Sequence, residues 1–301
     1  MTGAPPQVVD SHLHLWDRRR FSYPWMTELP ALPETSLPIQ RTASATAAIV
    51  VEAGISPDQR TAEVEWLTAL AAEEPLIRGI VAAVDFTDPH LAEVVARLAD
   101  TPLVVGVRDN FESRPAGDLD PRTSPTAGAL LRGLDCARRV GLTVDLCVRA
   151  GQLAELDALL TSVVAVTGSA DGLVLDHLGK PLPADPDFSF EEWAEAMSAL
   201  AAHAGLHVKF SGLPGQMPGA VDPEAARELA DRFIGEVLTA FGPERTMYGS
   251  DHPVSTTGHG LGDGEWEQAA AAALHHVVDD TDFAAVMGTT AADFYLTRRT
   301  Q

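Results

Sequence analysis

Residues 8–17, VVDSHLHLWD, are the stretch of this 301-residue chain that separates the possible folds. Its apolar residues are typical of a buried strand, and Asp10, His12 and His14 recur at period 2, so that they share one face. The residues that follow, HLWDRRR, contain no glycine. An open doubly wound sheet usually carries a Gly-rich phosphate loop at this point, so the stretch favours a closed barrel.

Seven further short apolar segments follow along the chain, and nearly every one precedes an amphipathic or Ala-rich helical pattern. They are residues 45–54, 77–86, 103–111, 142–150, 172–181, 206–213 and 245–254. Strict alternation of strand and helix implies a parallel sheet, and eight such units that close on themselves form a TIM barrel of about 250 residues. Because no linker or composition shift divides them, we expect a single (β/α)8 barrel domain over residues 1–301.

Residues 18–41 interrupt this alternation with a Pro-rich and aromatic segment that has no periodicity. Phe21, Tyr23, Trp25 and Met26 give it apolar surface to bury, so we expect an ordered loop. Such long loops are often lids or walls of a site, although a surface excursion on the barrel flank is the equal alternative.

The composition of the chain limits the kinds of molecule that it is expected to bind. The formal net charge is -22, and an acidic surface repels nucleic acid and anionic membranes, so neither partner is expected. The two cysteines, Cys136 and Cys147, form no CxxC pair, and we see no signal peptide and no apolar run of the roughly 20 residues that span a bilayer. We therefore expect a cytoplasmic protein that binds a small molecule; a homo-oligomer is possible.

Polar residues gather at the carboxyl ends of the expected strands, where TIM-barrel active sites lie. They are His12, His14, Glu52, Arg108, Asp109, Asn110, Arg149, Asp176, His177, Lys180, Lys209, Ser211, Ser250, Asp251 and His252. Buried polar groups cost free energy unless they are paired, so this one-sided distribution indicates a pocket.

The first and last strands of a closed barrel are neighbours, so His12, His14 and Asp251 should converge. We expect the side chains of His12 and Asp251 to lie within about 10 Å of each other. Two imidazoles and a carboxylate suit one divalent ion, Zn²⁺ or Mn²⁺. They suit equally a metal-free acid–base site, so the expected number of metal ions is zero or one.

Cations near the same strand ends suggest an anionic substrate or a developing oxyanion. They are Arg108, Arg149, Lys180 and Lys209, and the alternative for each is a salt bridge to the acidic protein. We assign Arg108, Arg149 and Lys180 to substrate binding, together with Trp16. His259, in a Gly-rich loop, is a weaker candidate for the mouth of the site.

The order of the motifs DSHLHLWD, GVRDNFES, DLCVR, LDHLGKP, KFSGL and MYGSDHPV resembles the amidohydrolase-2 group of the amidohydrolase superfamily. Within this group the chain is most similar to TIM-barrel lactonases that hydrolyse sugar lactones and pyrone-dicarboxylate lactones. The resemblance runs over nearly the whole chain, and it rests on the order of the motifs rather than on any one of them.

This resemblance implies roles for individual residues. His12 and His14 match the first-strand HxH pair, and His177 matches the histidine after strand six. Asp251 matches the strand-eight aspartate that handles the hydrolytic water, and Arg108 matches an arginine that contacts substrate. The resemblance thus implies Asp251 and His177 as catalytic residues, and His12, His14, His177 and Asp251 as the metal ligands.

Two departures from the wider superfamily are visible. Arg108 and the DLCVR stretch stand where a bridging Lys or Glu and a metal-binding His are usual, so a two-metal centre is not expected. His252 stands before the strand-eight proline, where Trp or Tyr is common.

Three functions remain open on the sequence. The first is a lactonase, in which water attacks the carbonyl of the cyclic ester of a sugar acid or a related anionic or polyhydroxylated molecule. The second is a metal-dependent non-oxidative decarboxylase of an aromatic or unsaturated acid. The third is a catalytically silent binding barrel, against which the intact His and Asp set argues.

Overall fold

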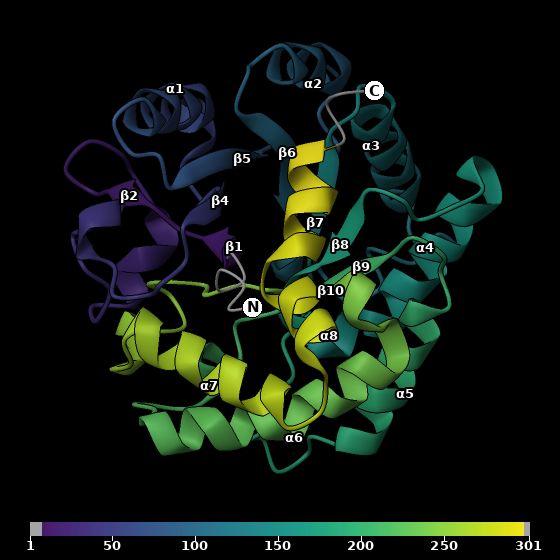
Figure 1. Ribbon diagram of the computed structural model, residues 1–301. Helices are drawn as coiled ribbons and strands as arrows, with labels where there is room; N and C mark the ends of the chain where they lie inside the picture. Colours follow the sequence, from purple (N-terminus) through teal and green to yellow (C-terminus); the bar gives the residue numbers. More distant parts are fainter. Residues whose placement is uncertain (1–7, 298–301) are drawn as a thin grey trace.

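Eight parallel strands form the centre of the molecule in the computed structural model, which describes residues 8–297 (Figure 1). In the order of the sheet they are β1 (Val9–Leu13), β4 (Ala47–Val51), β5 (Ile77–Ala83), β6 (Val104–Asn110), β7 (Thr143–Cys147), β8 (Leu173–Leu175), β9 (His207–Phe210) and β10 (Thr246–Tyr248). Each strand pairs with the next along the chain, which confirms the predicted TIM barrel.

The barrel closes just beyond the end of β10. The backbone amide of Asp251 donates to the carbonyl of His12 at 2.8 Å, and that of His14 donates to the carbonyl of His252 at 2.9 Å. A parallel bridge joins Leu13 to His252. Closure therefore brings the polar motif of β1 into backbone hydrogen-bond contact with the polar motif that follows β10.

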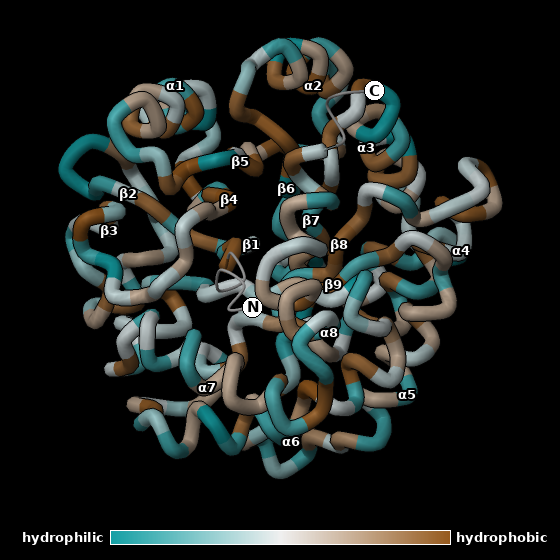
Figure 2. The backbone as a smooth tube through the Cα atoms, viewed as in Figure 1, coloured by the Kyte–Doolittle hydropathy of each residue, from teal (hydrophilic) through white to brown (hydrophobic). Residues whose placement is uncertain are grey.

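Helices surround the barrel, and hydrophobic residues follow the central strands (Figures 1 and 2). The α-helices are α1 (Arg60–Ala71), α2 (Leu91–Ala99), α3 (Ala127–Arg139), α4 (Leu153–Thr167), α5 (Phe190–Ala201), α6 (Pro223–Phe241), α7 (Asp263–His275), α8 (Asp280–Ala284) and α9 (Thr290–Ala292). Short 3-10 turns are η1 (Pro24–Glu28), η2 (Pro38–Gln40), η3 (Pro57–Gln59), η4 (Phe111–Ser113), η5 (Ala150–Gln152), η6 (Asp176–Gly179), η7 (Pro214–Gln216), η8 (Pro243–Arg245) and η9 (Thr257–His259). Local chemistry marks the helix starts: the Asp222 side chain accepts from the amide of Ala225, with Pro223 in the first turn of α6.

The stretch Ala150–Thr167, which comprises η5 and α4, is long and apolar enough to cross a membrane by length and composition. In the barrel one of its faces is buried, with Leu156, Leu159 and Leu160 fully covered. The apolar composition of α4 is therefore explained by its packing on the strands.

The segment 18–41 is ordered, as the sequence predicts. A two-stranded antiparallel ribbon, β2 (Trp16–Asp17) and β3 (Thr35–Ser36), closes its base, and Tyr23 and Met26 are buried beneath it. Trp16 is fully buried in the same cluster, and its indole donates to the carbonyl of Pro33 at 3.0 Å. The ring of Trp16 therefore packs at the base of the loop, and its contact with substrate stays a prediction.

The last described residues form a helical segment that crosses the ends where the strands begin (Figure 1). After α8 it contains two π-helical stretches, η10 (Ala285–Thr289) and η11 (Asp293–Thr297), which flank α9. Phe294 and Tyr295 belong there to one hydrophobic cluster with Val9 and Ala47. The sequence predicts a plain helix here, whereas the structure contains π-helical turns, which often occur at functional sites.

Candidate active site

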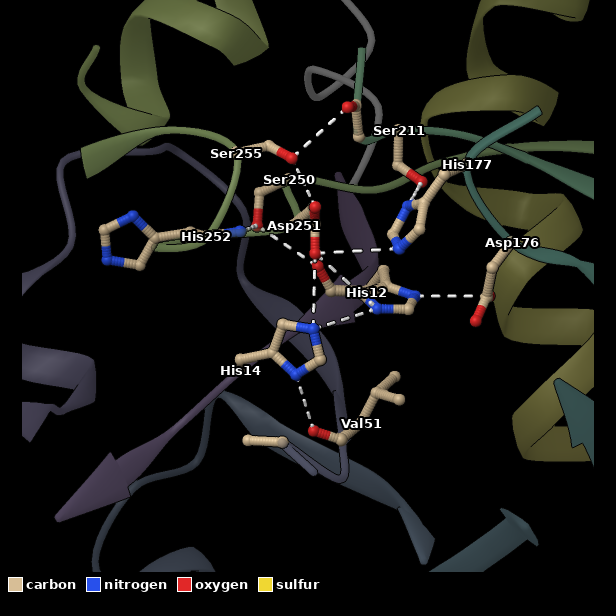
Figure 3. A network of polar contacts seen from close by, with 12 residues as sticks. His12, His14, Val51, Asp176, His177, Ser211, Ser250, Asp251, His252 and Ser255 are labelled. Atoms are coloured by element: carbon tan, nitrogen blue, oxygen red, sulfur yellow. Dashed lines mark hydrogen bonds and ion pairs between the residues drawn. The ribbon is translucent and has the colours of Figure 1, made fainter. Parts of the chain in front are cut away.

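Four side chains converge at the carboxyl end of the barrel (Figure 3). His12 and His14 lie in and just after β1, His177 follows β8, and Asp251 follows β10. Asp251 Oδ1 lies 3.2 Å from His14 Nε2, 3.7 Å from His12 Nε2 and 3.7 Å from His177 Nε2. The expected closeness of His12 and Asp251 is confirmed.

Unusual backbone positions aim two of these side chains. His177, Leu178 and Lys180 have φ values of 54°, 55° and 51°, and Asp251 has a φ of 49°. Left-handed conformations of non-glycine residues are uncommon, and they cluster where strain serves a site. Gly212 lies against His177: a Cβ at this position would lie 2.6 Å from the imidazole, so only glycine lets the loop after β9 pass.

Each converging side chain is held by a second partner. His14 Nδ1 lies 2.9 Å from the carbonyl of Val51, so it carries the proton and leaves the Nε2 lone pair facing Asp251. His177 Nδ1 contacts the Ser211 hydroxyl at 2.9 Å, and the Ser255 hydroxyl donates to Asp251 Oδ2. Such outer contacts orient metal ligands and fix their tautomers.

The geometry fits one divalent cation. His12 Nε2 and His14 Nε2 lie 3.2 Å apart. Ligands bound tetrahedrally to zinc at about 2.0–2.1 Å are about 3.3 Å from one another, close to the separations here. The residues that would hold the ion are His12, His14 and Asp251, with His177 beside them.

A second group that could hold a metal comprises His12, Asp176 and His177. The ammonium of Lys209 lies 3.0 Å from Asp176 Oδ1, so a cation is already present at this carboxylate. Within residues 8–297 these strand ends therefore offer room for one ion, where the sequence left the number at zero or one.

The protonation states of the site residues also suit the binding of a metal ion. Burial raises the pKa of Asp251, but His177, His14 and His12 outweigh it and hold this pKa well below its usual range. Burial lowers the pKa of His177 to about 4, and burial and Lys209 also lower the pKa of His12. At neutral pH the carboxylate of Asp251 is therefore ionised and the imidazoles of His12 and His177 are neutral, the forms that bind metal.

Arg108 is buried among fixed partners. Its Nε donates to Glu52 Oε1 at 2.7 Å, its Nη2 donates to the carbonyl of Glu52 at 2.6 Å, and its Nη1 lies 3.3 Å from Asp176 Oδ2. Burial lowers its pKa, but Glu52 and Asp176 outweigh this and raise it well above its ordinary value. The salt-bridge alternative thus describes Arg108, and its contact with substrate stays a prediction.

The other cations differ in exposure. Lys180 Nζ lies 2.5 Å from Glu112 Oε2, with both side chains partly exposed, and Lys209 is buried between Asp145 and Asp176. Arg149 is exposed, and it lies near enough to Glu112 to help lower the pKa of this carboxyl, after Lys180 and Asn110. Within the described residues Arg149 has no ion-pair partner, so among these four cations it is the one whose charge is not paired.

Two further histidines lie apart from the cluster. The ring of His252 points away from Asp251 (Figure 3), and its Nδ1 contacts the Thr256 hydroxyl at 2.8 Å. His259 Nδ1 lies 2.8 Å from the carbonyl of Gly219, so this imidazole ties the loops after β9 and β10 together.

Sequence reasoning assigned no role to two supporting residues, Asp10 and Asp145. Asp10 accepts from the amides of His12 and Ser250 and from the guanidinium of Arg41, which locks β1 to the loop after β10. Asp145 lies within β7, below the site. The available signal was a charged residue in the middle of an apolar strand, which seldom occurs without a partner.

A buried acid joins the loop to the barrel. The hydroxyl of Tyr23, in the segment 18–41, donates to Glu63 Oε1 of α1 at 3.1 Å. Burial, together with the nearby Glu52, raises the pKa of Glu63 to about 8. Glu63 is therefore largely protonated at neutral pH.

This raised pKa predicts a pH-dependent stability. Between pH 5 and pH 8 the folded state keeps a proton on Glu63 that the unfolded chain has released, so the free energy of unfolding falls as pH rises. Glu63→Gln removes this loss, and the variant should gain on the order of 3 kcal/mol over the parent across this window. Urea denaturation at pH 5 and pH 8 measures it, with the exposed neighbour Glu65→Gln as control. A difference between parent and Glu63→Gln that does not change with pH contradicts the prediction.

The fold and the converging His and Asp side chains define a TIM-barrel hydrolase with a site for one metal ion. The chain belongs to the amidohydrolase family, whose model matches residues 9–296. An L-fucono-1,5-lactonase of Burkholderia multivorans is 30% identical over 257 residues, with 82% of each chain covered. One of Burkholderia ambifaria is 26% identical, with 95% of this chain and 94% of the relative covered.

Solved structures agree with the fold. An amidohydrolase from Burkholderia multivorans, solved with bound zinc, superposes with a TM-score of 0.80 at 28% identity, covering 96% of this chain and 99% of that one. A probable 2-pyrone-4,6-dicarboxylic acid hydrolase from Acinetobacter baumannii superposes with a TM-score of 0.69 at 17% identity, covering 96% and 99%. The second likeness concerns the fold alone.

Proposed function

We propose that this protein hydrolyses the lactone of a sugar acid, with Asp251 and His177 as catalytic residues and one divalent ion held by His12, His14 and Asp251. The observation that carries the proposal is the convergence of three imidazole nitrogens, from His12, His14 and His177, on Asp251 Oδ1. The two relatives called L-fucono-1,5-lactonase support the same reaction.

The charges of the site favour a polyhydroxylated substrate over a dicarboxylate. Arg108, Lys180 and Lys209 are each paired with a carboxylate of this chain, so their charge is already compensated. A neutral lactone ring with several hydroxyls finds donors and acceptors here without the cost of leaving a buried charge unpaired. Arg149 remains available for a single hydrogen-bonded contact with the substrate at the mouth of the site.

In this reaction a divalent cation supplies Lewis-acid polarisation of the ester carbonyl. Asp251 accepts the proton of the attacking water at its carboxylate, which the Ser255 hydroxyl holds in place. The new bond joins the water oxygen to the carbonyl carbon, and the bond from this carbon to the ring oxygen then breaks. The ring oxygen needs one proton, and we assign its delivery to His177, which faces Asp251 and can relay the proton taken from water.

A substrate panel tests this assignment. Purified protein should release acid from sugar-acid 1,5-lactones, as measured with a pH indicator. Carbon dioxide release from aromatic or unsaturated acids would support the decarboxylase instead. Binding of both panels without turnover of either would indicate a silent barrel.

Metal content is a separate prediction. Protein purified without chelator should contain about one zinc or manganese ion per chain, because three ligand atoms are preformed. His14→Ala removes one ligand and should lower the bound metal to a small fraction, measured by elemental analysis. His252→Ala is the matched control, because this imidazole points away from the cluster and should not alter the metal content. Two ions per chain in the parent would contradict the site described here.

We also propose a cytoplasmic location, which the two free cysteines, Cys136 and Cys147, support.

A further inference from the structure

An ion pair at the carboxyl end of the barrel has no part in the hydrolytic steps proposed above. Glu112 lies in η4, which follows β6, and Lys180 follows η6 after β8. Lys180 Nζ contacts Glu112 Oε2 at 2.5 Å, and the two side chains are 20% and 24% exposed. The pair is therefore partly covered by the protein but still open to a ligand.

The backbone and a neighbouring amide hold this pair in place. The Asn110 side chain accepts from the backbone amide of Glu112 at 3.0 Å and donates to Glu112 Oε1 at 3.1 Å. Lys180 has a φ of 51°, and its backbone amide donates to the carbonyl of His177 at 2.8 Å. Both partners are thus fixed before a ligand arrives, which lowers the entropy cost of binding.

The pair also lies near the catalytic carboxylate. Burial lowers the pKa of Lys180, but the acidic groups around it, with Asp251 among them, outweigh this and raise the pKa. Burial raises the pKa of Glu112, but Lys180, Asn110 and Arg149 outweigh it and lower the pKa. At neutral pH the pair therefore consists of a carboxylate and an ammonium, close enough to Asp251 to interact with its charge.

The pair has hydrogen-bonding positions that the protein does not use. Within the described residues the Lys180 ammonium, which carries three hydrogens, donates one hydrogen bond, and each carboxylate oxygen of Glu112 accepts one. Because the two groups are in contact, the unused positions lie side by side, as do hydroxyls on adjacent carbons of a sugar ring. One such hydroxyl can donate to Glu112 while its neighbour accepts from Lys180. A carboxylate could only accept, and Glu112 would repel it.

We propose that Glu112 and Lys180 form the subsite that selects lactones with neighbouring free hydroxyls and rejects lactones that carry a carboxylate. Glu112 compensates the charge of Lys180 and lies close to Arg149, so these cations do not attract an anion while Glu112 is ionised. Removal of the Glu112 charge makes both cations available to a carboxylate. This inference rests on the proposed lactone hydrolysis and not on the metal ion.

Two lactones that differ in one group test the subsite. One is an aldonolactone that ends in a primary alcohol, and the other is the aldarolactone in which a carboxylate replaces this alcohol. Acid release gives kcat/KM for each, and the parent should prefer the neutral lactone. Glu112→Gln should shift the ratio of the two kcat/KM values at least about tenfold toward the carboxylate-bearing lactone, because a charged acceptor for hydroxyls is lost and a repulsion is removed.

Asp118→Asn is the matched control. Asp118 follows the same strand and has an 18% exposed side chain, but it pairs with Arg114 at 3.3 Å instead of Lys180. This variant should leave the ratio unchanged. A parent that prefers the carboxylate-bearing lactone overturns the inference, as does an unchanged ratio in Glu112→Gln or an equal shift in both variants.

If the parent hydrolyses neither lactone, the proposed function fails, and binding then decides the role of Glu112. The probes are the two corresponding lactams, in which nitrogen replaces the ring oxygen, and calorimetry measures their affinities. The parent should bind the neutral lactam more tightly, and Glu112→Gln should lose this preference. A parent without the preference, or a variant that keeps it, overturns the inference.

Discussion

Asp251→Asn should lower kcat by at least about 100-fold while the protein stays folded. Asparagine keeps the shape and still accepts from Ser255, but it can neither take a proton from water nor bind a cation as an anion. General-base catalysis alone is worth about 10²–10⁴-fold, and the loss of an anionic ligand adds to it. Steady-state kinetics on the lactone and a thermal melt of the same preparation measure both quantities.

Asp263→Asn is the matched control for this result. Asp263 is also a buried aspartate near the end of the chain, but it accepts from the backbone and hydroxyl of Thr42 and from Arg41, away from the ligand cluster. This variant should lower the melting temperature and leave kcat within a few-fold of the parent. If Asp251→Asn behaves in the same way, Asp251 serves only to hold its loop, and the proposed catalytic role fails.

Arg108→Ala should destabilise the protein by about 3–5 kcal/mol, because truncation leaves Glu52 buried without its cation and removes one of the two cations beside Asp176. The sequence alone suggests a different outcome, a KM that rises more than kcat falls. The structure favours the loss of stability, because each of the three guanidinium nitrogens of Arg108 donates to a group of the protein itself. Urea denaturation gives the free energy of unfolding, and kinetics on the folded fraction give KM.

A surface ion pair provides the comparison for Arg108. The Arg122 side chain is 76% exposed and pairs with Asp120, so Arg122→Ala should leave the urea midpoint nearly unchanged. Should Arg108→Ala match it in stability while KM rises, Arg108 would be a substrate-binding residue with little structural weight.

The hydrophobic periodicity of the sequence and the order of its strand and helix segments predicted the barrel and the main cluster of site residues. Eight apolar stretches alternating with helices predict the barrel, because side-chain periodicity is a local property that the chain displays along its length. His12, His14, His177 and Asp251 could be predicted as one cluster for a related reason: a closed parallel barrel places all carboxyl ends of its strands on one rim. The ordered segment 18–41 could be inferred from its aromatic residues, although not what they would pack against.

Only the tertiary structure decided which polar groups are partners. Arg108 pairs with Glu52, 56 residues away, and Tyr295 with Asp145, 150 residues away, and such pairs depend on strand register and on where the C-terminal segment crosses the barrel. Trp16 shows the same limit, since an indole beside a histidine motif can face a ligand or the base of a loop with the same local pattern. Sequence periodicity tells which face of a strand is buried, whereas the identity of a buried group's partner is set by three-dimensional packing, in which residues distant along the chain compete for each donor and acceptor.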